Sequence, residues 1–354
     1  MTRSAKLFTQ RVALAQVPSW GYALAKAMLR YRADVRTLGF VGFYFAFLAF
    51  AFWAWSQVGI AGQVPLVITL MAVSWICAII THNSLHTPVF KSRWANKLFQ
   101  VALTCSYGFP VSEYVVGHNL SHHKYVQERR DVMRTTKVQY GWNLFSFLMF
   151  FPTVGFDVTR ANYKYTATMK EKLPKWHRQL LLEMAVGWGT KAIFFAIDWK
   201  KALFLVLVPH LWAVWGITSV NYLQHDGCDK DHPVNHSRNF VGRIFNWFTF
   251  NNGYHGMHHE KAGLHWSLLP AEHMRVLHPT IHPALEQKSL LVYLFKTFVF
   301  PGKRLAYDGS PIVLPEEGPD ENWIPEKLPG EDMGAEGVIM AADSDLKLNA
   351  AAEA

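Results

Sequence analysis

Four stretches of the chain have the apolar character of membrane-spanning helices. The first runs from Leu38 to Val58 without a charged residue, and the second from Pro65 to Ile80. At about 1.5 Å per residue, about 20 residues cover the roughly 30 Å of hydrocarbon in a bilayer, so the first stretch is a transmembrane helix by length alone. The short connection between the two predicts a helical hairpin that returns to its starting side.

A second hairpin is predicted after a long gap. Its members run near Gln179 to Ile197 and from Ala202 to Leu223, with only four residues between them. Glu183 and Lys191 interrupt the apolarity of the first member, so the sequence marks the ends of that helix poorly. The two hairpins together place four spans in the chain.

The remaining apolar stretches are of a different kind. Residues 98–116 and 142–156 are broken by Gly or Pro and closely flanked by charge, which indicates helices in the membrane interface or against the bundle. Leu290 to Phe300 is too short to span. The predicted fold class is therefore all-α: an integral membrane protein with four transmembrane helices in two hairpins, interfacial helices and a histidine-rich cytoplasmic region.

The distribution of basic residues predicts the topology. The first 36 residues carry seven Lys or Arg, and residues 82–178 carry 14. Short basic segments next to spans mark the cytoplasmic side of a membrane protein, so we expect both termini and the region between the hairpins to be cytoplasmic. The same distribution accounts for the formal charge of +9 without nucleic acid as a partner.

Composition divides the chain into three parts. Residues 1–36 form a basic cytoplasmic segment, and residues 37–307 hold all of the spans and form the catalytic membrane domain. Residues 308–354 contain 12 acidic and 2 basic residues and are rich in Pro, Gly and Ala. Such a composition cannot build a core, which predicts a disordered tail that is dispensable for chemistry.

Histidine is the residue type that points to chemistry. The chain has 17 histidines, most of them in short clusters, whereas its three cysteines lie far apart and indicate neither a disulfide framework nor a thiolate zinc site. His82 and His86 follow the second span four residues apart, so on a helix they can point at one ion. Asn221 and His225 end the fourth span on one face in the same way.

Two triple clusters are more specific than these pairs. One has the pattern H-x-x-x-H-H and the other H-x-x-H-H, and they comprise His118, His122 and His123, and His255, His258 and His259. On a regular helix His118 and His122 share a face, and His123 is turned about 100° from its neighbour, toward a second ion. By chance each triple cluster is expected on the order of 0.04 times, so their joint presence at the ends of spans indicates function.

Nine clustered imidazoles exceed what one metal ion can hold, so the pattern predicts two ions. Neutral imidazole suits Zn, Cu, Fe and Ni, whereas Mg and Ca prefer carboxylates. A pair of irons with open coordination positions can use dioxygen to oxidise a methylene group. A site at the membrane face is also where an acyl chain can reach it.

The motifs HNSLH, HNLSHH and YHGMHH, on two membrane hairpins, resemble the histidine boxes of the membrane fatty acid desaturase and hydroxylase superfamily. NYLQHDG resembles the element after the fourth span in lipid desaturases and alkane monooxygenases. The resemblance covers roughly residues 38–300. It implies a non-haem di-iron centre, dioxygen as co-substrate, a lipid or acyl-chain substrate, and a separate electron donor that is ferredoxin-like or a haem protein.

The resemblance also implies a set of site residues. The iron ligands would be His82, His86, His118, His122, His123, His225, His255, His258 and His259. Asn221 would bind through a water. Asp226 would either orient a ligating imidazole or belong to a solvated acidic patch with Asp229 and Asp231.

Three functions stay open on the sequence. The first box lacks the Glu of the H-E-x-x-H form common in alkane monooxygenases, which favours a desaturase over a hydroxylase or monooxygenase. A histidine-rich metal transporter is the alternative from another class. Transport sites lie near the bilayer midplane, whereas these clusters lie at one membrane face, so an enzyme is favoured.

His210 stands apart, because it follows Pro209 in the middle of the fourth span, where an ionisable residue is expensive. It lies roughly 16 to 22 Å along the axis from Asn221 and His225, too far to bind the same ion. It is either a neutral imidazole bonded to a neighbouring helix, near Glu183, or a residue facing the channel that holds the substrate's far end. The other histidines are predicted to orient ligands or lie on the surface (His265, His273) or to be solvated (His177, His232, His236, His278, His282).

Overall fold

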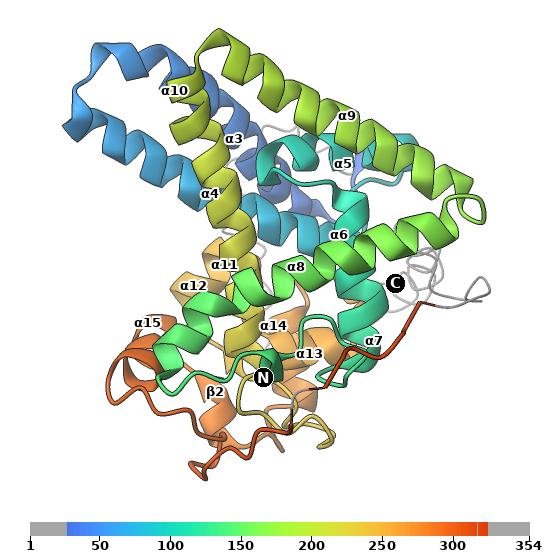
Figure 1. The fold of residues 1–354 in the computed structure, drawn as a ribbon, viewed down its shortest axis with the longest axis vertical. Helices are drawn as coiled ribbons and strands as arrows, with labels where there is room; N and C mark the ends of the chain where they lie inside the picture. Colours follow the sequence, from blue (N-terminus) through green and yellow to red (C-terminus); the bar gives the residue numbers. More distant parts are fainter. Residues whose placement is uncertain (1–26, 317, 325–354) are drawn as a thin grey trace.

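The computed structural model describes residues 27–316 and 318–324 of the chain. Their regular elements are helices apart from two short strands, which confirms the predicted all-α class (Figure 1). The elements are η1 Arg32–Asp34, α3 Val35–Ala54, η2 Trp55–Gln57, α4 Ile60–His86, α5 Arg93–Tyr107, α6 Val111–Gly117, η3 His118–His122, α7 His123–Tyr125, η4 Thr135–Lys137, α8 Asn143–Met169, α9 Pro174–Ile197, α10 Trp199–Ala202, η5 Leu203–Leu207, α11 Val208–His225, β1 Asn239–Phe240, α12 Arg243–Phe248, α13 His255–Glu260, α14 Leu269–Val276, η6 Pro283–Leu285, β2 Glu286–Gln287, α15 Leu290–Leu294 and η7 Phe295–Val299.

Four helical runs are long and apolar enough to cross a membrane, and they fall on the four predicted spans. Their bounds are Arg32–Gln57, Ile60–His86, Pro174–Ile197 and Trp199–His225. Each is longer than its apolar stretch. The second begins at Ile60 rather than Pro65 and continues to His86, so the first histidine box forms the last turns of the helix itself.

The fourth span changes its helical pitch just before Pro209. Residues Leu203–Leu207 form a π segment between α10 and α11. A proline in a helix lacks the N–H for the regular ladder, and its ring crowds the carbonyl four residues earlier, here that of Leu205. Because Leu205 lies inside the wider π turn, the helix continues past the proline instead of ending there.

The two predicted interfacial stretches differ from expectation in their extent. Residues 98–116 form two helices, because Gly108 ends α5 in the left-handed conformation, with φ of 102°, and Pro110 precedes α6. The stretch 142–156 is the first half of α8, which continues to Met169. Its buried residues recur every three or four positions, so one stripe of the helix faces the protein beyond the end of the apolar run.

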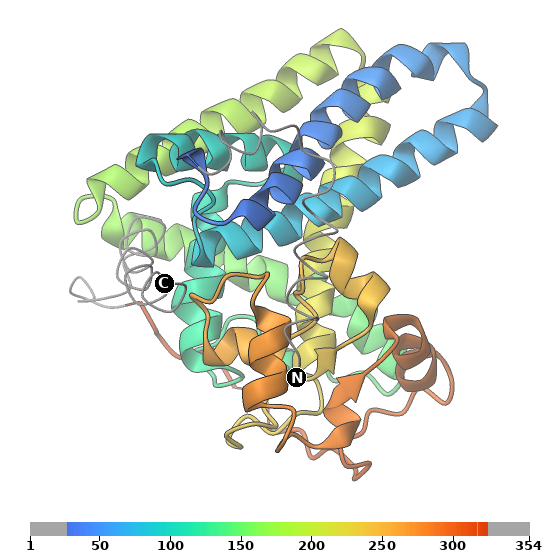
Figure 2. The same cartoon turned by 180° about the vertical axis from the view of Figure 1, so that it is seen from behind.

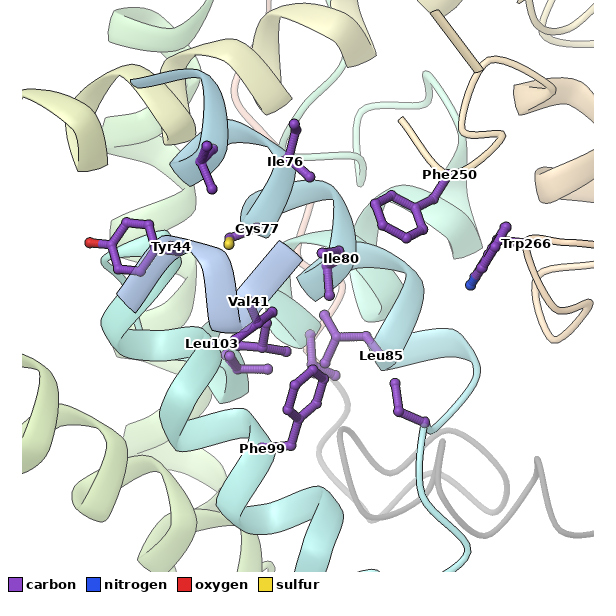
Figure 3. Packing of buried hydrophobic residues seen from close by; sticks show 14 of the residues in the cluster. Val41, Tyr44, Ile76, Cys77, Ile80, Leu85, Phe99, Leu103, Phe250 and Trp266 are labelled. Carbon is purple, nitrogen blue, oxygen red and sulfur yellow. The ribbon is translucent and has the colours of Figure 1, made fainter. Parts of the chain in front are cut away.

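The core is built around α4, which packs against α3, α5 and α11. Figure 3 shows side chains of these elements meeting, with Tyr44 from α3, Cys77 and Ile80 from α4, and Leu103 from α5. Each of these four is almost inaccessible. The close packing fixes the direction of α4 and therefore the position of the histidines in its last turns.

Both hairpins lie at one end of the molecule, and the elements after α11 lie at the other (Figures 1 and 2). The latter region includes a parallel pair of two-residue strands, in which Asn239 pairs with Glu286 and Phe240 with Gln287. This pairing ties the segment before α13 to the segment after α14. Helix α13 is thereby held beside the ends of α4 and α11.

The acidic segment after residue 307 packs on the body where the structure describes it. Asp320 pairs with Arg134 and Lys137, and Trp323 is buried against the ring of Tyr165. The predicted boundary at residue 308 therefore does not mark the end of packed structure. Residues 325–354 of the predicted tail, and residues 1–26 of the predicted N-terminal segment, lie outside the described residues.

Candidate metal centre

The nine predicted ligands gather in two adjacent groups. Within each group one ring nitrogen of every histidine lies within 4.8 Å of the others. The first group comprises His82, His86, His118, His123 and His258, and the second comprises His122, His225, His255 and His259. The side chains come from α4, from η3 and α7, from the end of α11 and from α13, which are far apart in sequence.

The H-x-x-x-H-H cluster is divided differently from the prediction. His118 shares its group with His123 rather than with His122. The prediction assumed a regular α-helix, but residues 118–122 form a π segment. Because a π turn is wider than an α turn and its backbone bonds join residues five apart, His123 comes round toward the side of His118, and His122 points at the other group.

The last cluster is also shared between the groups. His258 lies in the first group, whereas His255 and His259, four residues apart on α13, lie in the second. The pair His82 and His86 stays together in the first group, as four residues on a regular helix should. The two triple clusters thus bridge the groups, and only the pairs on regular helices follow the simple spacing rule.

The second group has the geometry of a metal site. The Nε2 atom of His225 lies 2.8 Å from that of His255 and 3.1 Å from that of His259, and the latter two are 3.1 Å apart. Each imidazole nitrogen carries either one N–H or one lone pair, so three mutual contacts cannot all be hydrogen bonds. Bonds of about 2.1 Å to one ion, at roughly right angles to one another, would place neighbouring ligands about 3.0 Å apart.

The first group fits an ion for similar reasons. The Nε2 atom of His123 lies 3.1 Å from those of both His118 and His258. The Nε2 atoms of His86 here, and of His122 in the second group, are buried without a hydrogen-bond partner among the described residues. Buried polar atoms without partners are costly, and one metal ion in each group would satisfy them.

The ring charges are also suited to metal binding. Burial lowers the pKa of His123 and of His259 well below the ordinary value, and the neighbouring imidazoles lower the pKa of each further. The pKa values of His118, His255 and His258 are lowered in the same way. Because the neutral imidazole is the form that binds a metal, burial prepares these side chains as ligands.

Three of the nine rings are oriented through their second nitrogen. The Nδ1 atom of His122 lies 2.9 Å from the carboxylate of Asp131. That of His225 lies 3.2 Å from the carbonyl of His236, and that of His82 lies 3.0 Å from the side-chain oxygen of Asn83. A bond at Nδ1 fixes the ring and leaves Nε2 for the metal. Asp131 escaped the sequence analysis, because it lies nine residues from His122 on a loop where no helical spacing relates the two.

Asp226 has a partner that the sequence did not indicate. It is buried, and its carboxylate accepts hydrogen bonds from Nε and Nη2 of Arg304 at 2.9 and 2.5 Å. It is therefore neither part of a solvated patch nor bonded to a ligating imidazole. Asn221 lies one turn before His225, and both polar atoms of its amide are buried without a partner among the described residues.

The histidines outside the two groups are held by other contacts. His265 is buried and bonded to Asp34 at 3.1 Å. His236 was predicted to be solvated, but it is buried, because its ring packs against His259 and lies 3.1 Å from Glu260, both on α13. Of the others, His273 is buried, His177 and His232 are half-buried, and His278 and His282 are exposed.

A sequence model described as fatty acid desaturase matches residues 59–287. The match covers more than half of the 354 residues and includes all nine histidines of the two groups. The chain belongs to the fatty acid desaturase family. This makes the protein an oxidoreductase. A search of curated proteins finds no match to the chain.

This desaturase-family protein has a cavity of about 470 Å³ beside its histidine groups. His82 and His118 of the first group and His255 of the second line it, together with Asn221. Most of the remaining wall is apolar and comes from the segment 107–117, from α8 and from α11. Ligand pockets of small molecules have about this size, and an apolar wall suits an acyl chain.

His210 is not one of the described residues that line this cavity. Its Nε2 lies 2.8 Å from the hydroxyl of Tyr44 on α3, and its ring fills the space beside Gly108, where a Cβ would come within 2.3 Å of it. Glu183, the suggested partner, instead accepts a hydrogen bond from the backbone of Ser112. These contacts favour the packing role over the channel role.

Proposed function

We propose that the protein is a membrane-bound, oxygen-dependent di-iron desaturase of fatty acyl chains. The observation that carries this proposal is that histidines of both groups line one apolar cavity. When bound, two irons would supply the oxidation of a C–H bond by dioxygen. The protein's part is to hold the irons, to exclude water and to place a methylene group beside them.

The ligand sets follow from the two groups. One iron would be held by His82, His86, His118, His123 and His258, and the other by His122, His225, His255 and His259. The second group supplies fewer nitrogens than the first. Asn221, buried one turn before His225 and on the cavity wall, is suited to complete this second set through a water.

The choice of desaturation over hydroxylation rests on the first box. It reads HNSLH, without the Glu of the H-E-x-x-H form, and this favours the removal of two hydrogens over the insertion of oxygen. The two outcomes differ in the product. Desaturation leaves a double bond, whereas hydroxylation adds an oxygen atom.

Lipid analysis separates these outcomes. We expect cells that express the protein to contain acyl chains with two fewer hydrogens, detected by mass spectrometry, and cells with His258→Ala to lack them although the protein is inserted. Hydroxylated chains instead would contradict desaturation while keeping the di-iron site. An active His258→Ala protein, or zinc alone in protein made with ample iron, would contradict the di-iron site itself.

The topology and the electron donor belong to the same proposal. The basic residues flanking the spans support cytoplasmic termini and a cytoplasmic position for the histidine groups. The donor would be a separate ferredoxin-like or haem protein that approaches from that side. Protease accessibility of residues 308–324 in sealed inside-out vesicles tests the orientation.

A further inference from the structure

Besides the histidines, the wall of the cavity includes one carboxyl group, that of Glu113. Glu113 lies on α6, five residues before His118, which is about 7.5 Å along a helix axis. Its side chain makes no hydrogen bond with any residue that the structure describes. The mechanism outlined above has no use for this carboxyl group.

The surroundings of Glu113 make an unpaired carboxylate expensive. Phe109, Pro110 and Phe151 line the same cavity, and burial raises the pKa of Glu113 above its ordinary value. Glu113 is half-buried, and a charged group partly removed from water without a partner costs free energy that hydrophobic packing does not return. A leucine would suit a pocket for a plain hydrocarbon better.

Other polar groups face the same cavity without a partner. The Oδ1 atom of Asn162 on α8 is buried and makes no hydrogen bond with the described residues. The Oδ1 atom of Asn252, on the same wall, is likewise buried without a partner among the described residues. Acceptors in an apolar cavity are suited to recognise a ligand that brings donors of its own.

We propose that Glu113 accepts a hydrogen bond from a hydroxyl or amino group of the substrate. The enzyme then selects long-chain substrates that carry such a donor over free fatty acids and plain hydrocarbons. A substrate carboxylate would face the like charge of Glu113, and a hydrocarbon would leave Glu113 unpaired, so both are disfavoured. This inference rests on the proposed function, because it takes the cavity as the substrate site.

Binding of four matched chains tests the subsite. Dodecane, dodecanol, dodecylamine and dodecanoate are titrated into iron-loaded protein in lipid nanodiscs, and tryptophan fluorescence reports the dissociation constants. We expect wild-type protein to bind the alcohol and the amine roughly tenfold more tightly than the other two, the scale of one hydrogen bond to a charged group. Glu113→Leu should remove this preference.

Glu113→Gln separates the two kinds of donor. Its amide oxygen still accepts from an alcohol, but it has lost the charge that attracts an ammonium group. We therefore expect binding of dodecanol within about threefold of wild type and a loss of roughly tenfold for dodecylamine. Glu171→Gln, at an exposed position after α8, serves as the matched control and should bind all four chains as wild type does.

Iron content and circular dichroism establish that each variant is folded. Equal binding of the four chains by wild type and Glu113→Leu would overturn the subsite and leave the cavity as the substrate site. Preference of wild type for dodecane or dodecanoate would do the same. Failure of wild type to bind any chain would overturn the assignment of the cavity, and the subsite with it.

Discussion

Glu183, on the candidate membrane span α9, accepts a hydrogen bond from the backbone N–H of Ser112 at 2.7 Å. Lys191, eight residues later, donates to the carbonyl of Gly108. The two side chains therefore bind opposite sides of the break between α5 and α6. A break in a helix leaves backbone groups without partners, and inside a membrane protein other side chains must satisfy them.

The first prediction concerns this break, which leads to Phe109 on the cavity wall and to His118. Glu183→Leu removes the acceptor, so we expect unfolding to be easier by about 1–3 kcal/mol and the iron content to fall. Glu183→Gln keeps an acceptor and should lose less. Thermal unfolding in detergent and metal analysis measure both. Glu171→Leu, at an exposed position, is the control, and a Glu183→Leu protein as stable as this control would refute the role.

The sequence specified the spans well, because apolar length alone determines what can cross a bilayer. It specified the break less well. Gly108 and Pro110 mark it. Glu183 and Lys191 bind the backbone groups that the break leaves without partners, but in the sequence they only interrupt an apolar helix. Their role depends on packing between α9 and the end of α5, which no local pattern reports.

At the metal centre, too, the sequence predicted some features, whereas others depend on tertiary packing. Clustering indicated all nine histidines of the two groups, yet the sharing of His118, His122 and His123 between the groups depends on a π segment that the spacing does not reveal. The hydrogen bond between His122 and Asp131, and the ion pair of Asp226 with Arg304, join loop residues without periodicity. Such contacts are set by tertiary structure alone.

The second prediction follows from the two groups. Purified protein should contain about two irons per chain, and His123→Ala and His259→Ala should each lose mainly one of them, because each removes a ligand from a different group. Metal analysis and Mössbauer spectra check this. Loss of both irons from both variants would contradict two separable sites.

The third prediction concerns Asp131, which faces Nδ1 of His122 at 2.9 Å. Asp131→Asn keeps the shape but removes the charge, and loss of such a supporting bond typically weakens metal binding about 10–100-fold. Titration with an iron chelator measures the change. Asp229→Asn, at an exposed position, is the matched control. Equal iron retention by the two variants would show that Asp131 does not support the site.

The fourth prediction separates two parts of the acidic segment. Truncation after Gly309 removes the ion pairs of Asp320 and the buried ring of Trp323, so we expect a lower unfolding temperature. Truncation after Ile324 keeps both contacts and should leave stability and iron content unchanged. Differential scanning fluorimetry compares the two. A protein ending at Gly309 that unfolds like the full chain would show that these contacts are dispensable.

The last prediction tests the role of His210, whose Nε2 lies 2.8 Å from the hydroxyl of Tyr44. His210→Leu leaves that buried hydroxyl with only a long contact, of 3.4 Å, to the carbonyl of Cys105. We therefore expect a loss of about 1–3 kcal/mol in stability. Tyr44→Phe removes the other partner, and the double variant should lose less than the sum of the single losses, because the two side chains interact directly.

Product analysis distinguishes packing from substrate contact in the same variants. His210 is not one of the described residues that line the cavity. Every variant that stays folded should therefore give products with the same acyl-chain lengths as wild type. His210→Phe adds volume beside Gly108, where the imidazole already fills the space, and should be the least stable. A stable variant with shifted product lengths would return His210 to the substrate channel.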